Sequence, residues 1–208
     1  GSSSINGLLY IRGQEQDYDI WRQLGNKGWG WNDVLPYFLK SENQERGQSN
    51  YHGVGGPLSV ADQRIKLSIL DAFMNAAEEV GIPKVNDFNK GDNFGCGYFQ
   101  VTEKNGLRCS AAVGYLNPIK KRKNLEIKTK CHVEKINFDG KKAISVSFWK
   151  DNNSLTIKAN KEIILSAGSI GSAQILQTSG IGDGNKLSQL GINVVKNSLG
   201  VGKNLQDH

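Results

Sequence analysis

Cysteine and histidine are both scarce in this sequence of 208 residues, which contains three of each. The cysteines, Cys96, Cys109 and Cys131, form no Cys-x-x-Cys pair, and no paired histidine motif accompanies them. An odd number of cysteines without such spacing argues against a disulfide framework and against a zinc site. We therefore expect no bound metal and a reducing compartment, the cytoplasm.

Long apolar runs are also lacking, so the sequence predicts no transmembrane segment. The chain has 26 Lys and Arg against 20 Asp and Glu, a net charge of +6. A basic surplus can indicate a nucleic acid partner, but here the basic residues are spread along the chain and the densest cluster is Lys120–Lys123. A solvated surface explains that distribution better, and we expect no nucleic acid partner.

Apolar residues recur at helical spacing in the first part of the chain. Residues 14–24 predict a helix in which Tyr18, Trp21 and Leu24 share one face, and a shorter helix is expected to begin near Asn32. Residues 65–80 carry the strongest helical pattern. Its apolar stripe is predicted to be core, and consists of Ile69, Leu70, Phe73, Ala76, Ala77 and Val80.

Ser110 is expected to cap a further helix that runs to Pro118. The chain then becomes rich in β-branched residues, and turn signals at Asp139-Gly140 and Asp151-Asn152-Asn153 predict an antiparallel meander. Its expected strands are residues 125–129, 133–138, 143–149 and 155–159.

The apolar run Glu162–Ser166 is typical of a strand buried on both faces of a parallel sheet. A turn and a helix from Ser172 to Thr178 are expected to follow. The sequence therefore predicts the α/β class, with α+β character where helices and the meander are segregated along the chain.

Two segments rich in glycine and serine are candidates for ligand contact. The first is Gly1-Ser2-Ser3-Ser4-Ile5-Asn6-Gly7, and the second is the strand-to-helix turn that begins at Ala167-Gly168. Glycine lets a ligand approach the backbone closely, and a helix start offers free amides to an anionic group. A tag remnant would also begin Gly-Ser-Ser, but here the run continues without a break into ordered-looking apolar sequence.

Taken together, the two segments resemble the signatures of the glucose-methanol-choline (GMC) oxidoreductases. The first match includes Tyr10, Gly13 and Asp19 at the family's spacing, and the second runs from Gly168 to Gly182, with Ser172-Ala173 where the family usually has Ser-Pro. Further similarity covers nearly the whole chain and is closest to the bacterial choline and alcohol dehydrogenase branch. It includes Gly28-Trp29, His52-Gly53, Gly97-Tyr98-Phe99-Gln100 and Gly200–His208.

The resemblance implies a Rossmann-like domain that binds FAD and an alcohol that is oxidised by hydride transfer to the flavin. Carried onto this sequence, the cofactor-binding residues are Gly1, Ser2, Asn6, Gly7, Leu8, Leu9, Val133, Ala167 and Gly168. Some members attach FAD through a histidine at the position of Ile5, so we expect a noncovalent flavin here.

The resemblance also implies that residues 1–208 are an internal fragment. Residues 1–24 and 120–208 would belong mainly to the FAD-binding domain, and 25–119 to an insertion toward the substrate domain. The G-x-G-x-x-G unit would precede Gly1, and the catalytic histidine would follow His208. We therefore assign no catalytic residue and expect the fragment itself to be inactive.

Neither the alcohol nor the electron acceptor is specified by these residues. Choline or another small primary alcohol is the family-level expectation, and peripheral membrane association of the complete protein is compatible with it. Two alternatives stay open at this point. One is a lyase of the same fold that holds FAD without using it, and the other is a basic nucleic-acid-binding module.

Overall fold

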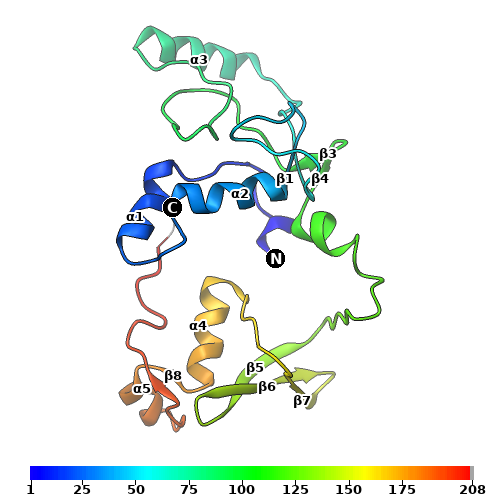
Figure 1. The fold of residues 1–208 in the computed structure, drawn as a ribbon, viewed down its shortest axis with the longest axis vertical. Coiled ribbons are helices and arrows are strands. Elements are labelled where there is room, and N and C mark those ends of the chain that lie inside the picture. Colours follow the sequence, from blue (N-terminus) through cyan, green and yellow to red (C-terminus); the bar gives the residue numbers. More distant parts are fainter. Residues whose placement is uncertain (207–208) are drawn as a thin grey trace. The chain divides into compact units, whose positions relative to one another are not determined.

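The computed structural model describes residues 1–206, which form an N-terminal unit, Gly1–Leu125, and a C-terminal unit that begins at Glu126 (Figure 1). Each unit contains both helices and strands, in agreement with the predicted α/β class. The boundary reflects compactness alone. Assignment of 1–24, 25–119 and 120–208 to an FAD-binding domain and an insertion therefore stays a prediction.

Two capped helices, α1 (Glu15–Gln23) and α2 (Trp31–Ser41), confirm the first two predicted helices. The Gln14 amide donates to Asp17 Oδ2 at 2.7 Å, and the Gly30 amide donates to Asp33 Oδ2 at 3.0 Å. Such bonds satisfy amides that the first turn of a helix leaves free. The predicted α1 face is only partly buried, because Tyr18 is covered by aromatic rings of α2 while Trp21 and Leu24 are exposed.

Helix α3 (Ser68–Glu79) lies within the predicted 65–80 range, but the prediction that its stripe is core is wrong. Ala77 is buried, whereas Ile69, Phe73 and Val80 are 65–76% exposed. Periodicity identifies the apolar face of a helix but not what covers it. Within residues 1–206, no element covers most of this face.

Short elements complete the N-terminal unit. They are the 3₁₀ turn η1 (Ser2–Ser4), the parallel pair β1 (Glu42–Gln44) and β2 (Leu58–Val60), the hairpin β3 (Glu103–Lys104) and β4 (Leu107–Arg108), and the π-helical turn η2 (Ala112–Leu116). Ala111 is the N-cap residue of η2, and the expected Ser110 lies one residue earlier, where its Oγ accepts the Val113 amide at 3.3 Å. The predicted helix after Ser110 therefore forms, but with π geometry.

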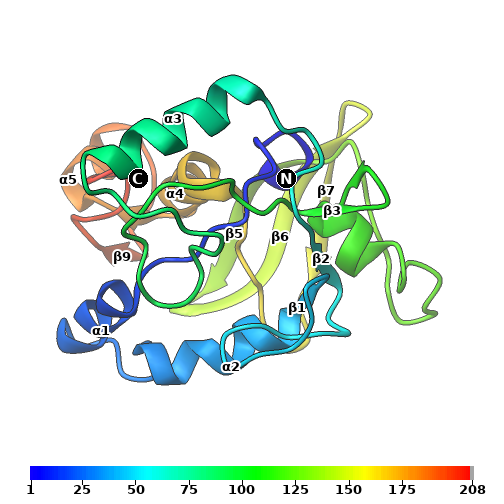
Figure 2. The same cartoon turned by 90° about the horizontal axis from the view of Figure 1, so that it is seen from above.

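The C-terminal unit begins with the predicted meander, which has three strands: β5 (His132–Asp139), β6 (Lys142–Lys150) and β7 (Asn153–Lys158) (Figure 2). Asp151 and Asn152 both have positive φ, as a two-residue hairpin turn requires. The fourth expected strand, residues 125–129, is wrong. Residues 125–129 pair with no strand among residues 1–206. β5 is an edge strand of the sheet and is hydrogen-bonded to β6 alone.

Helix α4 (Gly168–Thr178) packs against β5 and begins before the predicted Ser172. It leads into β8 (Ile181–Gly182), α5 (Gly184–Gln189) and β9 (Lys196–Asn197). The buried strand predicted for Glu162–Ser166 is wrong, and Ile164 is 79% exposed. A strand of a parallel sheet is buried by its neighbours, and the described residues supply none beside this run.

Candidate functional site

The segment Gly1–Leu9 forms a compact exposed loop, here called the N-terminal loop. Its first turn is closed by bonds from the Ser4 amide to the Gly1 carbonyl at 3.1 Å and from the Ile5 amide to the Ser2 carbonyl at 2.9 Å. A Cβ placed on Gly1 or Gly7 would meet no atom within 4 Å. Both glycines therefore face open space, and a ligand could approach their backbone.

Leu8 has an unusual backbone conformation, with φ of 68°. The left-handed region is rare for residues with a Cβ, costs roughly 1–2 kcal/mol, and is concentrated at functional sites. The Leu8 amide donates to Asn6 Oδ1 at 3.2 Å, so the Asn6 side chain supports this conformation directly. The loop thus holds a strained residue next to the open side of Gly7.

Residues 100–111 hold the N-terminal loop in place through hydrogen bonds. The Leu8 carbonyl accepts the Thr102 amide at 2.8 Å, and the Tyr10 amide donates to the Gln100 carbonyl at 2.8 Å. Arg108 Nη1 donates to Asn6 Oδ1 at 2.6 Å. Sequence reasoning missed Thr102 and Arg108, although the turn dipeptide Asn105-Gly106 between β3 and β4 was a hairpin signal that could have placed both.

Free hydrogen-bond donors lie on the same loop. Within residues 1–206, the amides of Ser2, Ser3 and Gly7 donate to no protein acceptor. Unpaired backbone amides beside glycines suit a ligand rich in acceptor oxygens, such as one with phosphate or carbonyl groups. The chemistry of Gly1, Ser2, Asn6 and Gly7 therefore fits a nucleotide cofactor.

The other predicted contacts, Val133, Ala167 and Gly168, lie in the C-terminal unit. Ala167 and Gly168 are exposed at the start of α4, where Gly168 has φ of 82° and open space around its Cβ position. Val133 is half-buried on β5, next to Glu134, whose carbonyl accepts Thr178 Oγ1 at 2.7 Å.

Val133 is therefore adjacent in sequence to a residue that contacts the last turn of α4, whereas Ala167 precedes its first turn, and α4 itself is about 16 Å long. No small ligand group could contact both ends of α4, but an extended nucleotide is long enough to do so.

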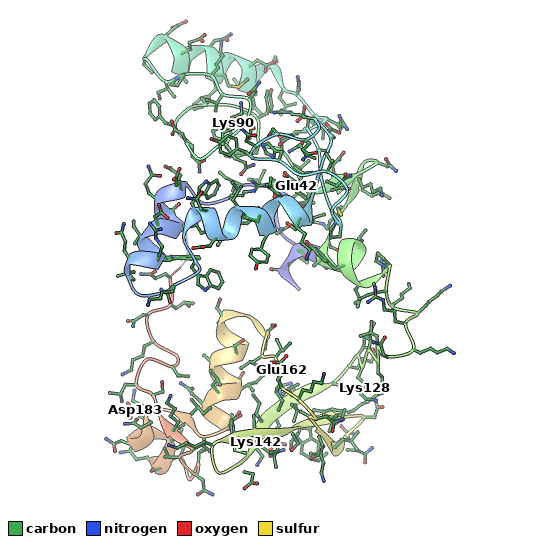
Figure 3. The ribbon with its side chains drawn as sticks, in the orientation of Figure 1. Glu42, Lys90, Lys128, Lys142, Glu162 and Asp183 are labelled. Atoms are coloured by element: carbon green, nitrogen blue, oxygen red, sulfur yellow. The ribbon has the colours of Figure 1, made fainter. Side chains whose placement is uncertain are left out.

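A buried charged network stabilises the N-terminal unit. Arg12 Nη2 pairs with Glu42 Oε2 at 2.8 Å, and His52 bridges two carboxylates, Glu42 at 3.0 Å and Asp87 at 2.9 Å. Glu42 lies where α2 passes into β1 (Figure 3). Its side chain is fully buried. The network ties together segments that are far apart in sequence, and sequence reasoning did not find it.

The two carboxylates control the protonation of His52. Hydrogen bonds to Asp87 and Glu42 raise the pKa of His52 to about 9, so the imidazole is charged at neutral pH. Burial alone would raise the pKa of Asp87, but the hydrogen bonds from His52 and the Asn89 amide lower it. Burial raises the pKa of Tyr10, whose hydroxyl accepts from Arg12 Nη2 at 3.1 Å.

Two of the three histidines, His52 and His132, lie within residues 1–206. Both ring nitrogens of His52 are within hydrogen-bond distance of carboxylates, Nδ1 of Glu42 and Nε2 of Asp87. His132 is exposed at the start of β5, and His208 lies outside the described residues. Residues 1–206 contain no group of side chains that could hold a metal ion, and no helix among them is long and apolar enough to cross a membrane.

Comparison with known proteins gives matches over the whole chain. The family model described as GMC oxidoreductase matches residues 1–208. The chain is 41% identical over 208 residues to the mitochondrial choline dehydrogenase of Homo sapiens, covering 100% of this chain and 35% of that protein. It is 41% identical over 211 residues to an alcohol dehydrogenase (acceptor) of Pseudomonas putida, covering 100% and 38%.

Among solved structures, an FAD-dependent oxidoreductase from Chaetomium thermophilum matches with a TM-score of 0.94 and 37% identity, covering 100% of this chain and 38% of that one. The chain therefore spans between 35% and 38% of the length of these three proteins.

Proposed function

Because the chain belongs to the GMC oxidoreductase family, we propose that the protein is an FAD-dependent oxidoreductase that acts on the CH–OH group of a primary alcohol. The observation that carries the proposal is the N-terminal loop, where open glycines and free amides lie beside the strained Leu8. Relatives named as choline and alcohol dehydrogenases support it over a lyase or a nucleic-acid-binding module.

The N-terminal loop would receive the flavin side of the cofactor. Gly1 and Ser2 would lie by the pyrophosphate or ribityl chain, with their small size allowing close approach. Asn6, Gly7, Leu8 and Leu9 would approach the isoalloxazine, with the Gly7 amide as a donor. Ile5 carries no nucleophile and is 85% exposed, so the flavin is proposed to be bound noncovalently.

The C-terminal unit would hold the adenosine side. Val133 would contact the adenine through its backbone, and Ala167 with Gly168 would lie beside the rest of the ADP portion. Their separation along α4 suits an extended nucleotide and would suit no compact ligand.

When bound, FAD supplies the hydride acceptor for oxidation of an alcohol to an aldehyde. The contribution of this chain is to bind and orient: backbone amides donate to cofactor oxygens, and open glycines let the cofactor lie against the loop. Choline or another small primary alcohol is the proposed substrate class, in line with the named relatives. No described residue is proposed as the catalytic base.

Two measurements on protein made from its complete reading frame test this function. FAD should be released on denaturation without proteolysis, as a noncovalent cofactor must be. Anaerobic addition of choline, a primary aliphatic alcohol or benzyl alcohol should then bleach the bound flavin. A protein without flavin would contradict the proposal, and one whose flavin no alcohol bleaches would favour the lyase alternative.

A cytoplasmic location is also proposed, because the three cysteines of the chain form no disulfide in the structure. Fractionation of the source cells tests it. Recovery in the membrane fraction that is reversed by salt would instead indicate peripheral association.

A further inference from the structure

We propose that Arg108 is a positioning residue for the cofactor: it fixes Asn6, and through Asn6 the Leu8 backbone, in the form of the N-terminal loop that receives the flavin. The inference rests on the proposed function, because it assigns a role toward the same cofactor. Arg108 itself need not touch FAD. It acts on the loop that does.

The geometry of Arg108 is specific. Its Nη1 group donates to Asn6 Oδ1 at 2.6 Å and to the Ser3 carbonyl at 3.2 Å, so one nitrogen ties two points of the loop. The Asn6 oxygen that accepts from Arg108 also accepts the Leu8 amide at 3.2 Å. Arg108, Asn6 and the left-handed Leu8 are therefore linked in one chain of hydrogen bonds.

Arg108 is itself firmly placed. It ends β4, where it pairs with Glu103, and the next amide, of Cys109, donates to the Thr102 carbonyl at 2.9 Å. Besides the two bonds from Arg108, a bond from the Ala111 amide to Ser3 Oγ at 3.1 Å also joins residues 108–111 to the N-terminal loop. The guanidinium thus projects from a rigid hairpin to the loop, which is how a support for a binding site should be built.

The positive charge of Arg108 is not balanced by a carboxylate among residues 1–206. Among residues 1–206, no carboxylate lies within ion-pair distance of its guanidinium, and both of its acceptors are neutral. A neutral donor could also make hydrogen bonds to these two neutral acceptors, so the positive charge is not needed to hold the loop. The half-buried guanidinium therefore adds a positive charge beside a loop with free amides, which favours an anionic ligand on that loop, and FAD carries two phosphates.

Removal of Arg108 should release the loop without unfolding the unit. Asn6 Oδ1 would keep the Leu8 amide as its only donor, and Leu8 could relax from the left-handed region. The loop would still be attached through the bonds of Thr102 and Ala111. The expected effect is therefore on the affinity for FAD, because the loop must be ordered again when the cofactor binds.

The test uses protein made from its complete reading frame, with FAD removed and added back. Arg108→Met should raise the dissociation constant for FAD about tenfold or more, because the two bonds that hold the loop are lost and binding must order the loop again. Arg108→Lys should give a smaller increase, because the ammonium keeps a charged donor but does not reproduce the position of Nη1, which makes both bonds. Arg122→Met is the matched control, since the exposed Arg122 makes no side-chain bond within residues 1–206, and it should bind FAD as the wild type does.

Asn6→Ala and the double variant Asn6→Ala/Arg108→Met test the route through Asn6. If Arg108 acts through Asn6, the double variant should bind FAD no more weakly than the worse single variant. Fully additive losses would overturn that route. Hydrogen exchange of the Leu8 amide in the cofactor-free protein should be faster in Arg108→Met, whereas the melting temperature of that protein should match the wild type.

The outcomes separate this inference from the proposed function. If the wild type binds no FAD, both fail. If the wild type binds FAD and Arg108→Met binds it equally well, the inference alone fails. If Arg108→Met does not fold, Arg108→Lys decides: weakened binding with an unchanged melting temperature supports the inference, and wild-type affinity overturns it.

Discussion

The two units bury polar groups in different ways. The N-terminal unit buries charges from distant segments, with Arg12, Glu42 and His52 in direct contact. The C-terminal unit buries an uncharged ladder on adjacent strands, where Asn137 Nδ2 donates to Ser145 Oγ at 3.0 Å and to Ser147 Oγ at 2.8 Å. The first arrangement fixes long-range topology, and the second fixes only the register of neighbouring strands.

The difference has an energetic consequence. A buried ion that loses its partner keeps its charge in a poor solvent, which costs several kcal/mol. A hydroxyl that is removed from a ladder leaves partners that are neutral and have other bonds, which costs about 1 kcal/mol. The comparison therefore predicts a steep order of mutational effects between the two units.

The largest effect is expected for Glu42→Ala. Glu42 is fully buried and accepts from Arg12, His52 and the Gly53 amide. Its removal leaves the buried Arg12 without a carboxylate partner and leaves His52 with Asp87 alone. The free energy of unfolding should fall by about 3–5 kcal/mol. Urea unfolding followed by tryptophan fluorescence measures this, since Trp21, Trp29 and Trp31 all lie in the N-terminal unit.

Glu42→Gln serves as a second variant that keeps the shape and loses the charge. It should cost nearly as much as Glu42→Ala if charge balance matters most. A loss below about 1 kcal/mol in both variants would break the comparison, because the network would then contribute no more than a surface pair does.

The second effect is a pH dependence that His52 gives to the N-terminal unit. Its pKa is about 9 in the folded protein against an ordinary value of 6.5, so the folded state holds the proton more tightly than the unfolded chain. The stabilisation is complete below pH 6.5 and is lost as the pH rises through 9. A shift of this size corresponds to about 3 kcal/mol.

His52→Gln should remove that slope. Wild type and variant are compared by urea unfolding at several pH values between about 6 and 10, with the difference in unfolding free energy expected to shrink toward high pH. A constant difference across the range would show that His52 stabilises the unit by shape alone.

The sequence predicted what depends on local signals. Helices α1, α2 and α3 and the turn at Asp151-Asn152 follow from capping residues, apolar spacing and residues that tolerate positive φ. Local patterns also located the Gly1–Gly7 loop. They could not show what holds it, because Arg108 and Thr102 reach the loop from about a hundred residues away.

Errors arose where burial depends on a partner. Glu162–Ser166 and the stripe of α3 have the composition of core, yet Ile164 and Phe73 are exposed within the described residues. Apolar composition specifies that a segment tends to be buried, and only a neighbouring element decides whether it is. The network of Glu42 and His52 was missed for the same reason, since its members are separated in sequence and have no shared motif.

A smaller effect is expected for Ser147→Ala in the C-terminal ladder. Ser147 Oγ contacts Asn137 and Thr156, but Asn137 would keep its bond to Ser145. The loss should be about 1 kcal/mol and independent of pH. Trp149, on the same strand, reports unfolding of this unit. A loss as large as that of Glu42→Ala would mean that neutral ladders are as critical as buried charges.

The smallest effect is expected for Glu126→Gln, which sharpens the comparison because Glu126 also has a shifted pKa. A hydrogen bond from Lys128 lowers the pKa of Glu126, just as ion pairing lowers that of Asp87. Glu126 and Lys128 are exposed, however, so water and salt screen the pair and the side chains lose entropy to form it. The free energy of unfolding of Glu126→Gln, measured with urea at neutral pH, should match that of the wild type at both low and high salt. A clear loss at low salt that disappears at high salt would show that an exposed pair contributes to stability here, and burial would then no longer separate the two kinds of charge.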